Sequence, residues 1–316
     1  MKYSIIVPFY NEEKNVFLLN EEINKAINSI IKDSTREFEI IYVDDGSKDK
    51  TYEKMLECKK NQYKTKLIRH KYNLSQSSAL FTGIKFSNYD NLIFLDGDGQ
   101  NDPNDLIKMV QLFEQGKDMV TGWRKNRKDN FIVKTLPSIF ANSIVRIFTN
   151  SKIHDQGCGI KILKKEMIDF NVVWGDFHRL LSARLSNNLY EIEEVEVNHR
   201  KRLEGKSNYN FFRVFRVLLD LIYMNFFKIG GRPIIYIFGN YGIISIFLSI
   251  ISFLVMIYFK FKFSVDFDQT PLPVLSVFLF LMGILFILIG LIAQLIINQS
   301  PNKVLMESQI KEVNEN

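Results

Sequence analysis

The pattern of apolar and polar residues divides the chain into two parts. In residues 1–210, short apolar runs alternate with segments in which apolar residues recur every three or four positions. The short runs are typical of buried strands, and the longer period is typical of amphipathic helices. We expect strands at Tyr3–Val7, Phe38–Val43, Lys66–Arg69, Leu92–Leu95, Asp118–Thr121, Gly159–Leu163 and Tyr190–Val197. We expect helices at Glu12–Ile31, Asp49–Lys60, Ser75–Phe86, Pro103–Glu114 and Phe131–Thr149. This alternation predicts an α/β fold, a mostly parallel sheet with helices on both faces.

Two long stretches without Asp, Glu, Lys or Arg follow, from Pro233 to Phe259 and from Leu272 to Asn302. Each is long enough to cross a hydrocarbon core of about 30 Å at about 1.5 Å per helical residue. A helix of that length in a soluble core would carry a polar stripe. We therefore predict transmembrane helices at 233–259 and 272–298, with a solvated tail at 299–316. Residues 211–232 combine apolar bulk with basic side chains, which is typical of a helix at the membrane interface.

The membrane topology follows from the ends of the chain. The first apolar run is too short for a signal peptide, so residues 1–210 are expected to stay in the cytoplasm. Two crossings return the tail to the same side. The flanking charges agree only in part, since Lys260 and Lys262 lie in the short outer loop. We expect a multi-pass protein of the inner (cytoplasmic) membrane.

The charge and composition of the chain bear on which ligands and partners it could bind. The chain has 316 residues and a formal charge of +6, which could suggest nucleic acid. Its basic residues concentrate at Arg124–Lys134 and Arg200–Arg232, close to the apolar stretches, so a lipid phosphate and an anionic membrane surface explain them better. Cys58 and Cys158 lie far apart, which supports neither a disulfide framework nor a zinc site. The histidines show no paired metal-ligand spacing.

Acidic residues follow the first two expected strands, where ligands bind in parallel sheets. Tyr10 with Glu12 and Glu13 could hold a planar base, or the acids could simply occupy the first turn of a helix, as the macrodipole favours. Asp44 and Asp45 could bind a ribose or a base, or cap the next helix. Both interpretations remain open at each position.

A third acidic group, Asp96-Gly97-Asp98, follows the fourth expected strand. Two carboxylates one residue apart repel each other unless a cation neutralises them. Mg²⁺ and Mn²⁺ bind through one or two carboxylates together with substrate phosphates, and Gly97 would permit the close approach of a diphosphate. An Asp-x-Asp alone also occurs in polar turns, but after two other acidic strand ends it predicts a metal and diphosphate site.

These motifs together resemble the family-2 glycosyltransferases of GT-A fold. More narrowly, they resemble the polyisoprenyl-phosphate glycosyltransferases, the group of dolichol-phosphate mannose synthase and undecaprenyl-phosphate glycosyltransferases. The resemblance covers essentially the whole chain. It rests on Val7-Pro8-x-Tyr10-Asn11-Glu12-Glu13, Asp44-Asp45-Gly46-Ser47, Asp96-Gly97-Asp98-Gly99-Gln100-Asn101-Asp102-Pro103, Gly122-Trp123-Arg124 with Arg127, Asp155-Gln156-Gly157-Cys158-Gly159, His178-Arg179, Val197-Asn198-His199-Arg200-x-Arg202 and Gly205-Lys206-Ser207. The departures, at Asn73-Leu74-Ser75, Gly97, Gly99 and Asn101, remove no metal-binding oxygen.

The resemblance implies a role for each matching residue. The donor would be held by Pro8, Tyr10, Glu12, Val43, Asp45, Asp96, Gly97 and Asp98. The divalent metal, Mg²⁺ or Mn²⁺, would be held by Asp96, Asp98 and Gln100. The donor and lipid phosphates would be surrounded by Arg124, Arg127, Lys134, Ser138, Arg200, Arg202 and Lys206. Asp98, Asp155 and Arg124 would be catalytic. Asp155 matches the family's proposed base, and the alternative is that it positions the acceptor or a basic neighbour.

The implied reaction is inverting transfer of a sugar from a UDP- or GDP-linked donor to a polyisoprenyl phosphate, with undecaprenyl phosphate favoured, for the cell envelope. A phosphate monoester, with a second pKa near about 6, is mostly ionised at neutral pH, so a strong base is less necessary than for a hydroxyl acceptor. The alternatives are a membrane glycosyltransferase that uses another lipid, such as a diacylglycerol, and a non-catalytic nucleotide-binding scaffold. The absence of a Gln-x-x-Arg-Trp element argues against a processive polysaccharide synthase.

Small residues within the two apolar stretches permit close helix packing. They could pack the two helices of one chain together or join copies into a homo-oligomer, and the sequence favours neither. They are Gly239, Asn240, Gly242, Gly283 and Gly290.

Overall fold

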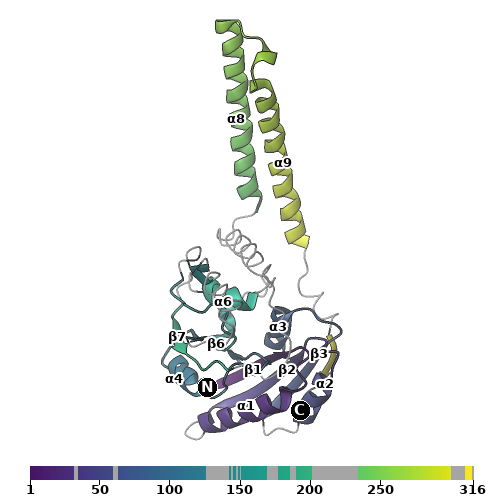
Figure 1. Cartoon of the computed structure of the whole chain (residues 1–316), viewed down its shortest axis with the longest axis vertical. Helices are drawn as coiled ribbons and strands as arrows, with labels where there is room; N and C mark the ends of the chain where they lie inside the picture. The colour runs from purple at the N-terminus through teal and green to yellow at the C-terminus, as the bar shows by residue number, and fades with distance from the viewer. Residues whose placement is uncertain are drawn as a thin grey trace. The chain divides into compact units, whose positions relative to one another are not determined.

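The computed structural model divides into two compact units, Met1–Met224 with Lys303–Asn316, and Asn225–Asn302 (Figure 1). The predicted interface helix at 211–232 and most of the predicted helix Phe131–Thr149 lie outside the described residues. The structure describes residues 1–31, 35–59, 63–125, 142–143, 145–146, 149, 151–168, 177–185, 190–200, 234–299 and 310–314.

An eight-stranded sheet forms the centre of the first unit, in the order β7-β5-β6-β4-β1-β2-β3-β8. Its strands are β1 (Lys2–Phe9), β2 (Glu37–Asp44), β3 (Lys64–His70), β4 (Asn91–Phe94), β5 (Met119–Trp123), β6 (Lys161–Lys164), β7 (Ile192–Glu196) and β8 (Ile310–Asn314). β1 is parallel to β2 and β4, β2 to β3, and β5 to β7. β6 runs antiparallel to β4 and β5, and β8 runs antiparallel to β3. The predicted mostly parallel sheet is confirmed.

Helices cover both faces of this sheet, also as predicted. α1 (Val16–Ile31), α2 (Thr51–Cys58) and α4 (Asp105–Glu114) share one apolar core, and α3 (Gln76–Phe86) and α6 (Phe177–Leu185) share the other. A short 3-10 turn, Lys165–Met167, follows β6. Successive residues of β1 enter opposite cores, with Ile5 and Val7 in the first and Ile6 in the second. Burial on both faces explains why the central strands are continuous apolar runs.

The end of the chain, where we expected a solvated tail, forms a strand at residues 310–314, and its residues are half-buried or exposed. β8, the yellow strand beside β3 in Figure 1, pairs along β3 from Leu67↔Asn314 to His70↔Ile310. The Asn314 side-chain amide donates to the Tyr52 hydroxyl at 2.9 Å. The segment has little apolar periodicity, and the unpaired edge of β3 supplies the hydrogen bonds that order it. Because β3 precedes the apolar helices and β8 follows them, the sheet and the tail lie on the same side of any membrane that both helices cross.

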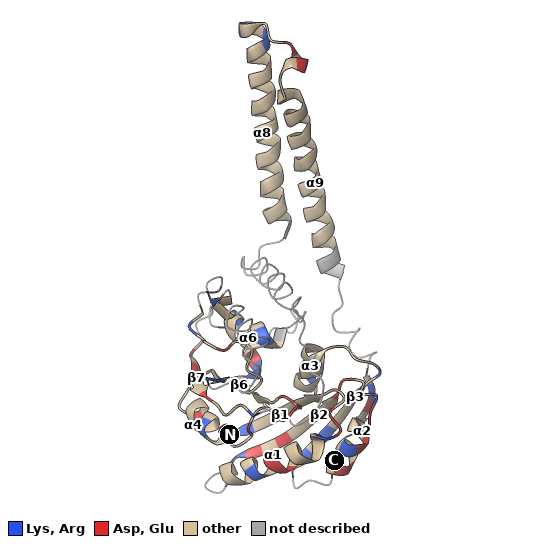
Figure 2. Ribbon diagram, viewed as in Figure 1, with Lys and Arg blue, Asp and Glu red and all other residues tan. Residues whose placement is uncertain are grey.

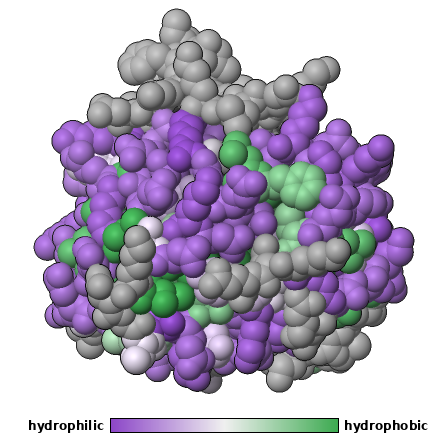
Figure 3. Space-filling model, turned by 90° about the horizontal axis from the view of Figure 1, so that it is seen from below, coloured by the Kyte–Doolittle hydropathy of each residue, from purple (hydrophilic) through white to green (hydrophobic). Residues whose placement is uncertain are grey.

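The second unit is a helical hairpin. α8 (Ile234–Phe263) and α9 (Leu272–Gln299) are joined through a 3-10 turn, Phe267–Gln269, and both are long and apolar enough to span a membrane. Within residues 234–299 of this unit, Figure 2 shows charged residues only near the connection between the two helices. Large apolar side chains face outward, for example Phe247 at 61% and Val274 at 75% exposure. Such exposure is costly in water but suits lipid. By contrast, the face of the first unit in Figure 3 is mostly hydrophilic.

Small residues pack α8 against α9 within the chain. A Cβ on Gly242 would lie 2.8 Å from the Gly283 carbonyl oxygen, and one on Gly283 would lie 2.8 Å from that of Gly242. The Ser245 and Ser249 hydroxyls donate to backbone carbonyls of α9, each at 2.7 Å. Gly239 has open space instead, with no described atom within 4 Å of such a Cβ. These contacts identify intrachain packing for Gly242 and Gly283.

Truncation before β8 is expected to destabilise the first unit. A chain ending at residue 309 loses the β3–β8 hydrogen bonds, which we expect to cost roughly 1–3 kcal/mol and to lower Tm by about 2–10 °C. Thermal unfolding of the detergent-purified protein, followed by circular dichroism, measures the shift. The matched control ends at residue 314 and keeps β8. Equal Tm values for the two truncations would contradict a stabilising role for the strand.

Two glycines of α8, Gly242 at the contact with α9 and Gly239 in open space, allow a matched test of the helix packing. We expect Gly242→Leu to force the helices apart at a cost of about 1–3 kcal/mol, as overpacking does in cores, whereas Gly239→Leu enters open space. Resistance of the hairpin to proteolysis in detergent compares the two variants. If Gly239→Leu proves as disruptive as Gly242→Leu, the helix contact is not the one described here.

Candidate functional site

The carboxyl ends of β1, β2 and β4 lie at one edge of the sheet, because these neighbouring strands are parallel. The loops after β1 and β2 are joined directly: the Asn11 N–H donates to the Ser47 hydroxyl, and the Lys48 N–H donates to the Asn11 side chain, both at 2.9 Å. Asn11 adopts a left-handed φ of 54°, which asparagine tolerates better than most residues. The loops that carry the first two acidic groups are therefore joined by hydrogen bonds.

The loop after β1 is not the first turn of a helix. α1 begins at Val16, so Glu12 lies before it. The Glu12 carboxylate is buried and accepts from the Asn15 side chain at 2.5 Å. Tyr10 is 36% exposed, so its ring is accessible to a ligand. Pro8 and Val43 are buried, and they could contribute only shape and backbone atoms to a binding site.

Asp44 stabilises the turn that follows β2. Its carboxylate accepts from the Ser47 N–H at 2.9 Å and pairs with the Arg69 guanidinium at 3.1 Å. Burial raises the pKa of Asp44, while the contacts with Ser47 and Arg69 act in the opposite direction. It does not cap α2, whose N-cap residue is Lys50. Asp44 is therefore a structural residue of the loop.

Asp45 organises the loop between β3 and α3. One carboxylate oxygen accepts from His70 Nδ1 at 2.8 Å and from the Leu74 N–H at 2.9 Å. The other accepts from the Asn73 amide and the Ser75 N–H, both at 2.9 Å. These donors fill the lone-pair sites of a carboxylate. A nucleoside would have to replace one of these donors, among them the side-chain amide of Asn73.

Asp96 is fixed by amides on both sides. Its Oδ1 accepts from Gln76 Nε2 at 2.7 Å, and its Oδ2 accepts from Asn101 Nδ2 at 3.2 Å. The carboxylate also lies directly over Gly159, where an added Cβ would be only 1.9 Å from Oδ2. Gly159 is thus required for Asp96 to occupy this position.

Asp98 and Gln100 complete the loop after β4. Asp98 Oδ1 accepts from the Gln100 N–H at 3.1 Å, and both residues are half-buried. Between the two aspartates, a Cβ on Gly97 would lie 2.4 Å from the Pro8 carbonyl oxygen, so only glycine allows this approach of the loop to β1. Within the described residues, no three His, Cys, Asp or Glu side chains form a metal-binding group. Two carboxylates and an amide oxygen nevertheless fit Mg²⁺ or Mn²⁺, which complete their coordination with phosphate and water oxygens.

Arg200 is tied to this loop by both backbone and side chain. Its N–H donates to the Gln100 carbonyl at 2.9 Å. Its guanidinium binds Glu22 at 2.7 Å and Asp102 at 2.8 Å. Partial burial lowers the pKa of Arg200, but the hydrogen bonds to Glu22 and Asp102 outweigh it and the pKa is raised. Arg200 therefore lies beside the predicted metal loop as a charged group already paired with carboxylates.

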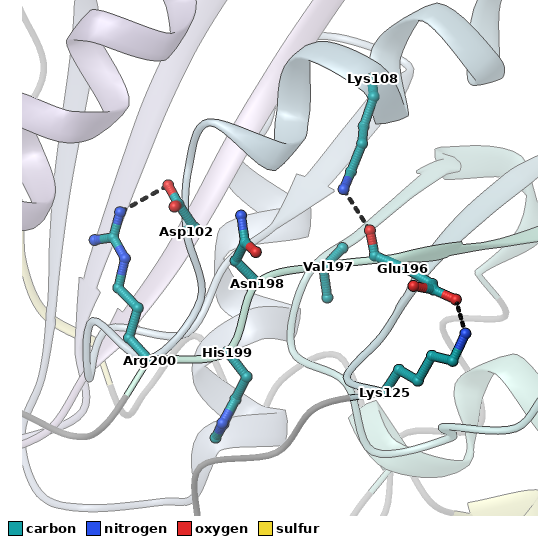
Figure 4. A pocket seen from close by; sticks show the side chains of 8 residues that line it. All are labelled: Asp102, Lys108, Lys125, Glu196, Val197, Asn198, His199 and Arg200. Atoms are coloured by element: carbon teal, nitrogen blue, oxygen red, sulfur yellow. Dashed lines mark hydrogen bonds and ion pairs between the residues drawn. The ribbon is translucent and has the colours of Figure 1, made fainter.

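A cavity of about 580 Å³ borders Arg200 (Figure 4). Its cations are balanced by acids, since Lys125 pairs with Glu196 at 2.5 Å and Arg200 with Asp102. The cavity is lined by Asp102, Lys108, Lys125, Glu196, Val197, Asn198, His199 and Arg200.

Arg124 and Asp155 form a buried two-pronged ion pair. Arg124 Nε and Nη2 donate to the two Asp155 carboxylate oxygens at 2.7 and 2.9 Å. The side chains are only 11% and 5% exposed. Burial alone would lower the pKa of Arg124, but the charge and hydrogen bonds of Asp155 raise it overall. Of the two roles open for Asp155, this geometry favours holding a basic neighbour.

Lys161 is a buried cation that the sequence interpretation missed. Its side chain is 2% exposed, and the ammonium donates to the Gln156 carbonyl at 3.3 Å and to the Cys158 carbonyl. Burial lowers its pKa, while Cys158, Asp155 and Asp96 act in the opposite direction. A lysine inside the apolar run Gly159–Leu163 was the available signal. Burial raises the pKa of the Cys158 thiol to about 11, so this thiol is protonated at neutral pH.

The His178-Arg179 motif joins α6 to α3. His178 Nε2 accepts from Arg179 Nε at 3.1 Å, so Nδ1 is the protonated nitrogen and donates to the Ser77 hydroxyl at 2.8 Å. Burial, together with Arg179 and Lys161, holds the pKa of His178 well below its usual value. His178 is therefore neutral and positions α6.

The other phosphate-binding residues implied by the resemblance lie outside the described residues, and their roles stay predictions. They are Arg127, Lys134, Ser138, Arg202 and Lys206.

Comparison with known sequences gives consistent results. Residues 4–172 match the model of the family described as Glycosyl transferase family 2. The chain is 32% identical over 308 residues to dodecaprenyl-phosphate galacturonate synthase of Rhizobium johnstonii, across 94% of this chain and 88% of that protein. It is 30% identical over 224 residues to undecaprenyl-phosphate 4-deoxy-4-formamido-L-arabinose transferase of Photorhabdus laumondii, across 70% of this chain and 67% of that protein.

A solved structure shares the fold. It is glucosyl-3-phosphoglycerate synthase from Mycobacterium tuberculosis, in complex with Mn²⁺, UDP-glucose and phosphoglyceric acid. The TM-score is 0.51 at 16% identity, across 71% of this chain and 78% of that chain. At this identity the likeness shows the architecture of the sheet and helices.

The contact between Gly159 and Asp96 gives a prediction for the metal loop. Gly159→Ala must displace the Asp96 carboxylate, and we expect Mn²⁺ binding in the presence of a nucleoside diphosphate to weaken about tenfold, as removal of a supporting contact does at metal sites. Electron paramagnetic resonance titration of Mn²⁺ measures the change. Gly157→Ala is the control, because its Cβ would meet Arg124 at an ordinary 3.5 Å. Unchanged Mn²⁺ affinity in Gly159→Ala would remove Asp96 from the metal site.

Proposed function

The chain belongs to glycosyl transferase family 2, and from this premise we propose that it transfers a sugar from a nucleotide-sugar to a polyisoprenyl phosphate. The observation that carries the proposal is the 32% identity to a dodecaprenyl-phosphate galacturonate synthase across 94% of the chain. That match covers 94% of the chain, so it includes the apolar hairpin as well as the sheet. A second relative, named as an undecaprenyl-phosphate sugar transferase, supports the same acceptor class. Undecaprenyl phosphate is the acceptor we favour.

The proposed reaction is a single displacement. A phosphate oxygen of the lipid bonds to the anomeric carbon as the bond to the nucleoside diphosphate breaks on the opposite face, so the configuration inverts. The acceptor phosphate is already largely ionised at neutral pH, with a second pKa of about 6, and little proton abstraction is needed. Asp155 then serves to hold Arg124 rather than to act as a base, and its paired geometry supports this role.

The main obstacle to this reaction is repulsion between two anionic phosphates. Arg124 keeps its charge in a buried site, and Arg200 lies beside the loop after β4. Guanidinium groups bind phosphate oxygens in a forked geometry. We assign Arg124 and Arg200, together with the basic residues that follow them in sequence, to the phosphates of donor and acceptor.

Asp96, Asp98 and Gln100 would hold the divalent cation, Mg²⁺ or Mn²⁺. A cation bound there would offset the charge that develops on the leaving diphosphate. The shared fold of a synthase solved with Mn²⁺ and UDP-glucose supports use of a divalent metal in this architecture. The exposed Tyr10 ring at the end of β1 is the group we assign to the nucleoside.

We place the reaction at the cytoplasmic face of the inner membrane. The two apolar helices would anchor the enzyme in the bilayer that contains its lipid acceptor. Basic residues just before α8 and after α9 support this orientation under the positive-inside rule, whereas Lys260 and Lys262 at the other end of α8 oppose it.

Asp98→Asn tests the proposed mechanism. We expect transfer to fall roughly 10²–10³-fold, the usual effect of losing one preorganised electrostatic group, with membrane insertion intact. The assay offers a panel of labelled nucleotide-sugars with undecaprenyl phosphate and Mn²⁺ or Mg²⁺, followed by extraction of lipid-linked label. Asp90→Asn is the control, an exposed aspartate at the opposite end of β4. Transfer that survives both Asp98→Asn and chelation of divalent metal would exclude the mechanism.

A further inference from the structure

Glu194 on β7 lies at the centre of hydrogen bonds that fix the segment before Asp155. Its carboxylate accepts from the backbone N–H of His154 at 3.0 Å and from that of Asp155 at 2.9 Å. It also contacts the Nδ1 atom of His154 at 2.8 Å. The side chain is 12% exposed, so these protein groups, rather than water, surround most of the carboxylate.

Asp155, whose backbone Glu194 holds, in turn binds the Arg124 side chain. Its two oxygens bind Arg124 Nε and Nη2, and Oδ2 also accepts from the Arg124 N–H at 3.3 Å. Arg124 directly follows β5, which is parallel to β7 with Thr121 opposite Glu194. Glu194, Asp155 and Arg124 therefore form a continuous series of contacts from one strand to the end of its neighbour.

The His154 ring adds a second support. It stacks on the Trp123 ring with centroids 4.7 Å apart and an interplanar angle of 19°. Trp123 is the last residue of β5 and precedes Arg124. The segment that presents Asp155 is thus held from both strands, by hydrogen bonds to Glu194 on β7 and by ring packing on β5.

We propose that Glu194 is a positioning residue for sugar transfer, acting through Asp155 to orient the Arg124 guanidinium toward a phosphate. The fork to Asp155 uses one edge of the guanidinium and leaves its other N–H groups for phosphate oxygens. Preorganised donors stabilise developing charge without reorganisation during the reaction. The inference rests on the proposed function and adds a residue that contacts neither substrate.

Glu194→Gln is the decisive variant. The amide keeps a single acceptor oxygen and places an NH₂ group against backbone N–H donors, so the segment at 154–155 loses its support. In the full-length protein we expect kcat to fall about 10- to 100-fold while KM for the nucleotide-sugar changes less than about threefold, the pattern of a lost transition-state interaction. Glu193→Gln is the control, on the same strand and 47% exposed, and it should match wild type.

A double-mutant cycle separates positioning from general destabilisation. If Glu194 acts through Arg124, adding Glu194→Gln to Arg124→Ala should change kcat by less than about twofold, because coupled residues are not additive. Glu194→Asp, which keeps the charge and both acceptor oxygens, should recover most of the lost rate. Full additivity, or a Glu194→Gln rate equal to that of Glu193→Gln, would overturn the proposal.

Binding of inorganic pyrophosphate gives a readout independent of the acceptor. Free pyrophosphate carries the additional charge that develops on the leaving diphosphate and that the intact nucleotide-sugar lacks. We therefore expect Glu194→Gln, but not Glu193→Gln, to weaken pyrophosphate binding about tenfold by isothermal titration calorimetry, the scale of one misplaced charged hydrogen bond, although KM for the nucleotide-sugar changes little. If wild type forms no lipid-linked product, the proposed function fails and this measurement still decides the inference. Unchanged pyrophosphate affinity in Glu194→Gln would overturn the inference even if transfer to the lipid is confirmed.

Discussion

The parallel pairing of β1 with both β2 and β4 is the constraint on which the rest of the site depends. It brings three loops to one edge of the sheet, and hydrogen bonds join the loops after β1 and β2 directly. The approach of the β4 loop to β1 is close enough that Gly97 allows no Cβ. The order of the strands also separates two functions. The loops of β1 and β2 form the proposed donor side, while β5, β6 and β7 supply the cationic side.

The buried and half-buried arginines of the site are balanced by neighbouring carboxylates. Both described guanidinium groups near the loop after β4 are paired with carboxylates in the absence of ligand, Arg124 with Asp155 and Arg200 with Glu22 and Asp102. Leaving a buried charge unpaired would be costly, so the site without ligand needs these acids. The two pairs differ in burial. Asp155 is 5% exposed and fixes its partner, whereas Arg200 is more open and could exchange a carboxylate for a phosphate.

The sequence predicted the sheet, the helices on both faces and the apolar hairpin. Strands buried on both faces are apolar runs, amphipathic helices show a helical period, and the hairpin helices are long and lack charged residues. The sequence also placed acidic residues after three strands, at the ends where ligands bind in parallel sheets. It could not predict that Asp45 binds His70 and Asn73, since such contacts depend on loop geometry. Glu194 was missed because β7 has adjacent glutamates, and only the strand register shows which one faces Asp155. β8 was missed because this segment forms a strand only by pairing with the edge strand β3, and it has no strand pattern of its own.

The central claim is that Asp96, Asp98 and Gln100 hold a divalent cation beside the diphosphate of the donor. The most direct test is a structure of the full-length protein with Mn²⁺ and UDP or GDP, with the metal located by its anomalous scattering. We expect a single strong peak within coordination distance of Asp96, Asp98 and Gln100, in contact with diphosphate oxygens. A nucleoside diphosphate bound at this edge of the sheet with the metal elsewhere, or with those side chains turned away from it, would contradict the account.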